Sequence, residues 1–521
     1  MPAWLRRERE QWAPSAAVFR SGAGLAVKTA LIGIFLCHAL FLINGYTSPD
    51  GTNEGLFFFW NQRWALSLGR WMMEYLSESV YNVVMPPVYL AFNGLCAAGV
   101  ILLLADLWKI RSRVFLVFGS LSLVVALAVI WQNLVIHVAY SYGFAMLMAV
   151  LAVYLIFSKR GAVSFGVAVV CLVLSMGTYQ AEIGFATGTV LCTLMLWCLQ
   201  EMPLAQLARK TGKALAMGAL GGVVYFVILQ EESARYGVPI SDRGGLSSFG
   251  AGSLLSGLVE NAHLAYHDFK QYFTSGPNHL GKAQLLVLLA AVVLLGLGFL
   301  RLVRRRKPQA AVLAVLGVLL PLGINVIDVL TGTEQNYLMS YPMQLMLPFV
   351  LMLAWREAAP RWWKGLARFG AGAAAFLVCW ISVVTAYATY HTVALAYRYV
   401  DTLTNAILTS VLTDEDYTPD TRVLIAGLPD ESQAQKFNFL YDSSCYQGPM
   451  VFWSGTNGVL GNWKNYIYDY HGLWIGEVAT DEYYDIIDSD DFAAMPVYPA
   501  EGSLQKCDDI LVVKLQEDPP R

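Results

Sequence analysis

Charged residues are scarce in this sequence. Asp, Glu, Lys and Arg make up 14% of its 521 residues, whereas soluble domains contain about 25%. A purely soluble enzyme is therefore excluded. Hydrophobic residues make up 56% and aromatic residues 13% of the chain, which is far more buriable surface than a disordered chain contains.

Several motifs of soluble enzymes are also absent. The sequence has no Walker A motif, no GxGxxG after a strand, no HExxH and no paired CxxC. These absences argue against nucleotide binding and a structural zinc site, and we expect no nucleic-acid partner. His263 and His267 have the spacing of a metal pair on one helix face. Because no carboxylate or third ligand is in register, we interpret them as interfacial polar residues.

The few charges are unevenly distributed. Residues 391–521 contain 21 acidic and 7 basic residues, a balance of −14, whereas residues 1–390 contain 17 acidic and 28 basic residues, a balance of +11. Two parts of opposite chemistry are thus joined in one chain. We expect a domain boundary between residues 390 and 391.

The hydrophobic residues gather in about eleven segments long enough to cross a bilayer. These segments cover residues 25–44, 88–107, 114–131, 138–158, 162–179, 184–199, 215–229, 284–300, 310–330, 343–355 and 370–390. The sequence therefore predicts a polytopic α-helical membrane protein. The segments 184–199 and 343–355 are short, so the predicted count has an uncertainty of one or two.

The basic residues predict the orientation of these spans. With the N-terminus inside, the inner loops hold most of them, including the run from Arg301 to Lys307. Positive residues concentrate in cytoplasmic loops, so this asymmetry places the N-terminus in the cytoplasm. This orientation places three long segments on the outer side of the plasma or inner membrane: the loops 46–87 and 230–282, and residues 391–521.

The outer segment 391–521 has the pattern of a small α/β domain. The runs Arg422 to Leu428 and Ile510 to Leu515 are rich in β-branched residues and suit buried strands, and the acidic stretch from Asp481 to Phe492 suits a helix. Cys445 and Cys507 are its two cysteines. In an oxidising compartment they suggest one disulfide, and two unpaired thiols are the alternative.

The first outer loop carries carboxylates immediately after the first span. Asp50 and Glu54 lie in a turn-rich stretch, and an amphipathic helix is expected to follow them. In that helix Trp64, Leu68, Trp71, Met72, Tyr75 and Leu76 share one face, and Arg63, Ser67, Arg70, Glu74 and Glu78 share the other. The many aromatic residues predict that this helix lies flat on the outer membrane surface. A second interfacial helix is expected from Leu254 to Phe273.

These residue types suit a reaction at the membrane surface. A carboxylate at a low-dielectric boundary has a raised pKa and can serve as a general base, which makes Asp50 the first candidate and Glu54 the second. Arg70 can bind a lipid-linked phosphate as a bidentate donor, with Arg63 and Arg243 as further outer cations. A solvated turn beside a surface helix is the alternative interpretation.

A further acid lies deep between two spans. Glu182 follows Tyr179 and Gln180 where two apolar segments meet on the outer side with almost no loop. An acid at such a depth is functional or internally paired. Asp328, Glu334 and Gln335, at the outer end of a later span, are candidates for the same cavity.

Four short motifs point to a family. They are Asn44-Gly45-Tyr46, Pro49-Asp50-Gly51, Leu68-Gly69-Arg70-Trp71 and Gly177-Thr178-Tyr179-Gln180. In this order and topology, the first 390 residues resemble the GT-C fold of lipid-dependent glycosyltransferases, and more closely the GtrII-type, serotype-converting O-antigen glucosyltransferases of bacteria. Many GT-C enzymes have two adjacent acids in the first loop, whereas Gly51 follows Asp50 here. The division of roles between Asp50 and Glu54 therefore stays open.

The resemblance implies an inverting transfer of glucose, or a similar hexose, from a polyprenyl-phosphate donor to a cell-surface glycan. It implies a lipid-sugar synthase and a flippase as functional partners, and Tyr179, Gln180, Glu182, Trp71 and Asp328 as substrate-binding residues. No cofactor is expected, although Asp50 and Glu54 are candidate ligands for a divalent metal. A transporter or flippase of lipid-linked glycans is the alternative, but the sequence has no inverted repeat of the kind that many transporters show.

Overall fold

Apolar segments fold as helices in lipid because their backbone N–H and C=O groups must be satisfied within the segment. The computed structural model describes residues 21–48, 63–159, 161–241, 251–334, 336–357, 363–430, 432 and 458–521. Within these ranges, seven helices are long and apolar enough to cross a membrane. An eighth span results if α7 (Arg113–Val124) and α8 (Leu127–Leu134), which are bent by 40°, count as one.

Two shorter apolar helices, Ser21–Cys37 and α10 (Ala162–Thr178), add to these spans. All eleven predicted segments lie in helical structure, which confirms a mostly helical protein built from membrane-type helices. The segment 343–355 consists of short pieces, η4 (Tyr341–Leu345), α17 (Met346–Met352) and the π-helical η5 (Leu353–Glu357). A count of eleven spans therefore stays a prediction.

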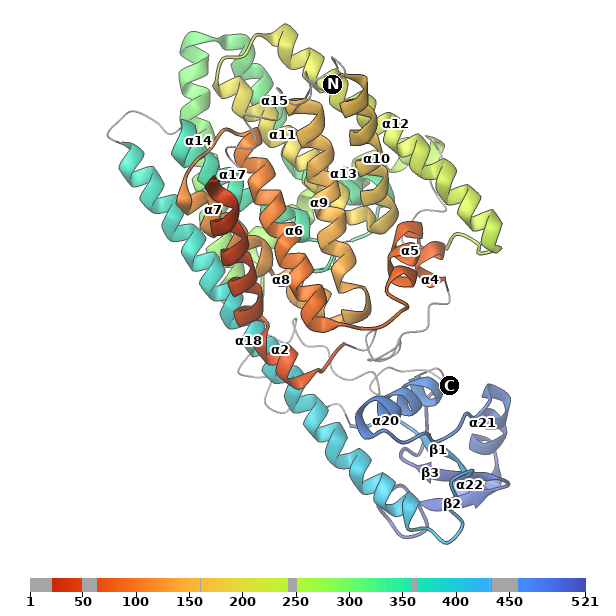
Figure 1. Cartoon of the computed structure of the whole chain (residues 1–521). Helices are drawn as coiled ribbons and strands as arrows, with labels where there is room; N and C mark the ends of the chain where they lie inside the picture. The colour runs from red at the N-terminus through yellow and green to blue at the C-terminus, as the bar shows by residue number, and fades with distance from the viewer. Residues whose placement is uncertain are drawn as a thin grey trace, which may run out of the picture.

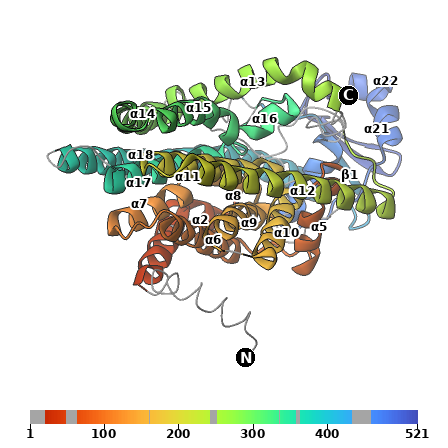
Figure 2. The same ribbon diagram turned by 90° about the horizontal axis from the view of Figure 1, so that it is seen from above.

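The helices lie in three layers (Figure 2). One outer layer holds α2 (Ala39–Asn44), α6 (Pro86–Leu107), α7, α9 (Ala139–Ser158) and α10. The middle layer holds α11 (Ile183–Leu199), α12 (Leu204–Tyr236), α17 and α18 (Trp363–Leu412). The other outer layer holds α13 (Ala251–Thr274), α14 (Leu280–Arg305), α15 (Lys307–Ile324) and α16 (Val326–Thr331). Short 3₁₀ turns, η1 (Ile136–Val138), η2 (Gln180–Glu182) and η3 (Pro277–His279), link some of them.

The surface of this body is apolar where lipid is expected. The outer-layer helices α14 and α15 expose Leu289, Val292 and Val318, whereas α9 buries most of its length between α6 and α10. Exposed apolar rows of this kind are costly in water and favourable in hydrocarbon. The fold therefore agrees with a membrane protein.

The first outer loop differs from the predicted single helix. It forms two short helices, α4 (Trp64–Ser67) and α5 (Trp71–Ser79), with a break at Gly69, whose φ is +80°. Glycine adopts this conformation at little cost, whereas other residues avoid it. The expected second helix is confirmed as α13, which covers residues 251–274.

The helix α18 continues beyond the predicted boundary at residue 390. It runs without a break to Leu412 and joins the helical body to a small sheet (Figure 1). No Pro or Gly interrupts the sequence between Tyr390 and Leu412, so nothing local ends the helix at the boundary.

Both expected strands are present in the C-terminal sheet. The strand β1 (Arg422–Ala426) pairs in parallel with β3 (Ile510–Lys514), with Val423 opposite Leu511. The unexpected β2 (Leu504–Cys507) pairs antiparallel with β3, which gives the order β1-β3-β2. The helices η9 (Gly458–Asn462), α20 (Trp463–His471), α21 (Thr480–Ile487) and α22 (Asp490–Ala494) accompany the sheet. The placement of this part outside the cell stays a prediction.

Candidate active site around Arg70

The turn between α4 and α5 is held by side chains from two other elements. The Gln180 Nε2 donates a hydrogen bond of 2.8 Å to the Leu68 carbonyl, and the Tyr225 hydroxyl donates one of 3.0 Å to the Gly69 carbonyl. The same Gln180 nitrogen lies 3.1 Å from the Tyr225 hydroxyl oxygen. The turn that carries Arg70 is therefore fixed against η2 and α12.

This turn places the Arg70 guanidinium over an aromatic ring. Its central carbon lies 4.7 Å from the centroid of the Tyr179 ring, and Tyr179 itself packs edge-to-face on Tyr142 at 4.7 Å. The Nε atom of Arg70 is buried and has no hydrogen-bond partner among the described residues. Arginine stacks well on aromatic faces and binds phosphate in a fixed geometry. The Arg70 side chain is thus held in place, and its Nε–H group makes no hydrogen bond to the described residues.

Trp71 packs in the core behind Arg70. Its indole ring lies so close to the Cα of Gly177 that a Cβ at this position would overlap the ring. Trp71 is buried, so its expected contact with substrate stays a prediction.

The position of Glu74 differs from the prediction, which placed it on the polar face of the helix. It is buried, with 3% of its surface exposed, and its Oε1 accepts a hydrogen bond of 3.0 Å from the Leu66 N–H. Burial raises the pKa of Glu74 to about 7. An unbroken helix would point this residue to solvent beside Arg70. The break at Gly69 reorients α5, and the free N–H groups at the start of α4 then hold the carboxylate. The glycine was the only local signal of this arrangement.

Arg63 is engaged by neighbouring side chains. Its guanidinium lies 3.5 Å from the Glu78 carboxylate and 3.5 Å from the centroid of the Tyr236 ring. Close by, the Tyr75 hydroxyl donates a hydrogen bond of 2.8 Å to Glu232. These residues line a shallow hollow that has no room for an enclosed water molecule. Of the two described candidates for a phosphate, Arg70 is therefore the better placed.

Glu182 and Asp328 are both fully buried. They come from neighbouring elements, because η2 contacts α16. Neither oxygen of the Glu182 carboxylate has a hydrogen-bond partner among the described residues, and Tyr179 and Tyr341 lie within its electrostatic range. A buried carboxylate without a partner is costly, which marks Glu182 as a group that awaits a ligand or a proton.

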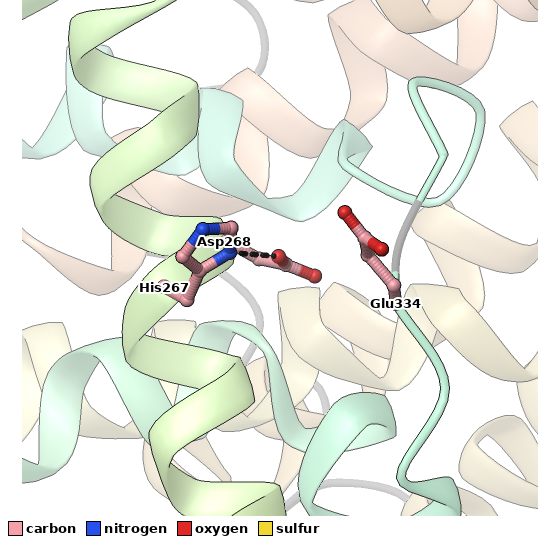
Figure 3. A group of neighbouring side chains, drawn as sticks. All are labelled: His267, Asp268 and Glu334. Carbon is pink, nitrogen blue, oxygen red and sulfur yellow. Dashed lines mark hydrogen bonds and ion pairs between the residues drawn. The ribbon is translucent and has the colours of Figure 1, made fainter.

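Glu334 lies beside a different group of side chains. It faces His267 and Asp268 on α13 instead (Figure 3). Gln335 lies outside the described residues.

The segment before Asp50 is anchored on α18. The ring of Tyr46 stacks on that of Tyr397 with centroids 4.2 Å apart, and the Ser48 N–H donates a hydrogen bond of 2.8 Å to the Leu134 carbonyl. The chain is thus fixed two residues before Asp50. Asp50, Glu54, Arg243 and Cys445 lie outside the described residues, and Cys507 has no disulfide partner among the residues that the structure describes. Their catalytic, phosphate-binding and disulfide roles stay predictions.

The layered apolar helices and this site define a polytopic helical membrane protein with a positioned arginine and buried carboxylates. Residues 39–353 match the family model "Glucosyl transferase GtrII", and the chain belongs to this family. The match confirms the resemblance and covers Arg70, the stretch from Tyr179 to Glu182, and Asp328. Membership indicates glucosyltransferase activity. No curated protein and no solved structure matches the chain.

Proposed function

We propose that this glucosyltransferase transfers glucose, or a similar hexose, from a polyprenyl-phosphate donor to a cell-surface glycan such as O-antigen. The observation that carries the proposal is the arrangement of Arg70, whose guanidinium is held on the Tyr179 ring and whose buried Nε has no hydrogen-bond partner among the described residues. A half-buried arginine held in one geometry can bind a phosphate with less loss of side-chain freedom than a fully exposed arginine.

The proposed reaction is a single displacement. A hydroxyl of the acceptor glycan attacks the anomeric carbon, and its proton passes to the carboxylate of Asp50, or of Glu54 if the two roles are exchanged. The bond between the anomeric carbon and the phosphate oxygen breaks, and the electron pair leaves with the polyprenyl phosphate. Arg70 stabilises the negative charge that develops there. Attack on one face and departure from the other inverts the anomeric centre.

The buried acids serve the sugar in this scheme. The free oxygens of Glu182 accept hydrogen bonds from sugar hydroxyls, and Asp328 lies on the adjacent element. Gln180 acts by positioning, because its amide holds the turn of Arg70. Arg63 and Arg243 add positive charge near the donor. Asp50 and Glu54 remain candidate ligands for a divalent metal in this proposal.

The location of the reaction follows from the distribution of charge. The proposed site lies on the outer face of the inner or plasma membrane, together with residues 391–521, because the basic loops favour the cytoplasm. A lipid-sugar synthase and a flippase then supply the donor from inside, and membrane lipid surrounds the polyprenyl chain. A C-terminal reporter that is active only outside the cytoplasm checks this orientation.

The decisive experiment compares two arginines. Purified full-length protein is assayed with radiolabelled polyprenyl-phosphate glucose and a lipid-linked glycan acceptor. Arg70→Ala should lower kcat/KM for the donor by about 10²–10³-fold, the usual loss of a group that stabilises transition-state charge. Arg235→Ala is the matched control, because Arg235 also lies over a tyrosine ring, that of Tyr236 at 5.2 Å, but is exposed and paired with Glu232.

Full activity in Arg70→Ala would contradict the proposed donor site. Movement of the lipid-linked sugar across vesicles without any transfer to the acceptor would support a transporter instead. NMR of the product reports whether the anomeric centre is inverted.

A further inference from the structure

We propose that His267, Asp268 and Glu334 bind a divalent transition-metal ion at a site separate from Arg70. One ligand atom of each side chain lies within 4.8 Å of the others. His267 and Asp268 project from α13, and Glu334 reaches toward them from the segment after α16 (Figure 3). An imidazole nitrogen and two carboxylates from two separate elements therefore converge on one point.

The distances suit coordination. The Nδ1 atom of His267 lies 3.2 Å from Oδ1 of Asp268. Two adjacent ligands that each lie about 2.1 Å from one ion are separated by about this distance. Glu334 completes the set of three, because one of its carboxylate oxygens lies within 4.8 Å of a ligand atom of each of the other two residues.

The helix α13, which carries His267 and Asp268, is fixed to the α16 region, which precedes Glu334 in the chain. The Asn261 side-chain amide donates a hydrogen bond of 3.1 Å to the Val329 carbonyl, and that of Asn325 donates one of 2.8 Å to the Ala265 carbonyl. Gly332 ends α16 with a φ of +65°, and a Cβ at this glycine would lie 2.8 Å from Asn261. The glycine thus allows the chain to turn toward α13. Ligands on rigid elements bind a metal with little loss of entropy.

One of the three ligands is buried and the other two are exposed. Asp268 is 5% exposed, between the buried Ala265 and Phe269, whereas His267 and Glu334 are exposed. A buried carboxylate gains from a nearby cation. The two exposed ligands leave coordination positions open to solvent, which water or an anion such as a phosphate can occupy.

The ligand types indicate which ions fit. Imidazole disfavours Ca²⁺ and Mg²⁺, which prefer oxygen ligands, and the absence of cysteine in the set disfavours the softest metals. Mn²⁺ and Zn²⁺ accept one nitrogen and two carboxylates. The sequence pattern predicts that His263 and His267 are interfacial polar residues. The set proposed here escapes this pattern, because its carboxylates come from the next residue and from a segment 67 positions away.

The experiment measures metal binding directly and does not depend on the proposed glucosyl transfer. Full-length protein in detergent is treated with EDTA, and Mn²⁺ is added back while free Mn²⁺ is followed by electron paramagnetic resonance. We expect one bound ion that Zn²⁺ displaces. Pulsed measurements should show the ¹⁴N coupling of one coordinated imidazole.

His267→Ala should abolish the ¹⁴N coupling, and Glu334→Gln should weaken Mn²⁺ binding by at least about tenfold while keeping the coupling. The matched controls are His263→Ala and Glu260→Gln, which change exposed residues on the same helix. Both controls should bind Mn²⁺ like the wild type. Gel filtration and thermal melting confirm that each variant is folded.

Several outcomes would overturn the site. One is unchanged Mn²⁺ affinity in Glu334→Gln; another is an ion whose ¹⁴N coupling survives in His267→Ala. A third is loss of the ion in Asp50→Asn with Glu54→Gln but not in the α13 variants, which would assign the metal to the first outer loop. If His267→Ala fails to fold, Glu334→Gln still decides the question.

Discussion

The Tyr397 hydroxyl donates a hydrogen bond of 2.9 Å to the carbonyl of Thr47. The contact joins the middle of α18 to the end of the first helical segment, three residues before Asp50 in the sequence. From α20, the Tyr470 hydroxyl donates a further hydrogen bond of 3.3 Å to the Gly45 carbonyl. The C-terminal part is thus connected to the start of the loop that carries the proposed base. These contacts give the hypothesis that the C-terminal part positions this loop, which the next variant tests.

Tyr397→Phe should therefore affect turnover more than stability. The variant keeps the ring that stacks on Tyr46 but loses the hydroxyl, which donates to the Thr47 carbonyl and also accepts from the Thr47 N–H at 3.3 Å. Each of these hydrogen bonds contributes about 1 kcal/mol to the free energy of unfolding. If the bond aligns the Asp50 loop, kcat should fall several-fold while KM for the donor changes little. Steady-state kinetics and thermal melting of the purified protein measure both quantities.

A second tyrosine on α18 provides the control. The Tyr387 hydroxyl donates a hydrogen bond of 2.8 Å to the Leu36 carbonyl in an exposed position. Tyr387→Phe removes this one hydrogen bond, so it should cost no more stability than Tyr397→Phe and leave kcat unchanged. Equal losses of kcat in the two variants would mean that the Tyr397 bond has no special relation to the reaction.

Gly177→Ala should disturb the packing behind Arg70. The added methyl group would overlap the Trp71 ring, and such overpacking costs about 1–3 kcal/mol. Because Trp71 adjoins Arg70, donor use should also weaken. Thermal melting in detergent and donor KM report the two effects.

Gly166→Ala serves as the comparison in the same helix. A Cβ at Gly166 meets nothing within 4 Å, and alanine favours helix over glycine by about 1 kcal/mol. This variant should be at least as stable as the wild type. A stable Gly177→Ala protein with normal donor KM would show that Trp71 can shift without consequence for Arg70.

The sequence predicted those features that depend on local pattern. Apolar runs identify the helices, and β-branched runs identify β1 and β3, because each pattern fixes the face that must be buried. The strand β2, with the sequence Leu504-Gln505-Lys506-Cys507, has no such pattern and forms because β3 offers it a free edge. Its pairing is a tertiary effect that a local window does not contain.

The site was predictable in its residue types but not in its contacts. Arg70, Tyr179 and Glu182 were identified from the sequence, yet the stacking of Arg70 on Tyr179 joins positions 109 residues apart. The approach of Glu334 to His267 and Asp268 on α13 likewise joins residues that are far apart in the sequence. Glu74 was misplaced, since a helical projection assumes an unbroken helix and Gly69 breaks it. Long-range contacts and single strained residues thus escaped the prediction.

Glu74 should make stability fall as pH rises through the weakly acidic range. Its pKa is about 7 in the folded protein, against an ordinary value of 4.5. Between these values the folded state binds the extra proton and the unfolded state does not, so the free energy of unfolding decreases with rising pH. A shift of this size corresponds to about 3 kcal/mol, lost between about pH 4.5 and pH 7. Glu74→Gln keeps an oxygen for the Leu66 N–H but cannot ionise, so its melting temperature should lack this decline and exceed that of the wild type at pH 8.

The control is Glu231→Gln, which changes an exposed residue on α12. It should keep the decline, because Glu74 is unchanged in this variant. Thermal melting at a series of pH values in a non-ionic detergent measures all three proteins. Parallel curves for the wild type and Glu74→Gln would show that Glu74 ionises freely and is not held in the low-dielectric position described here.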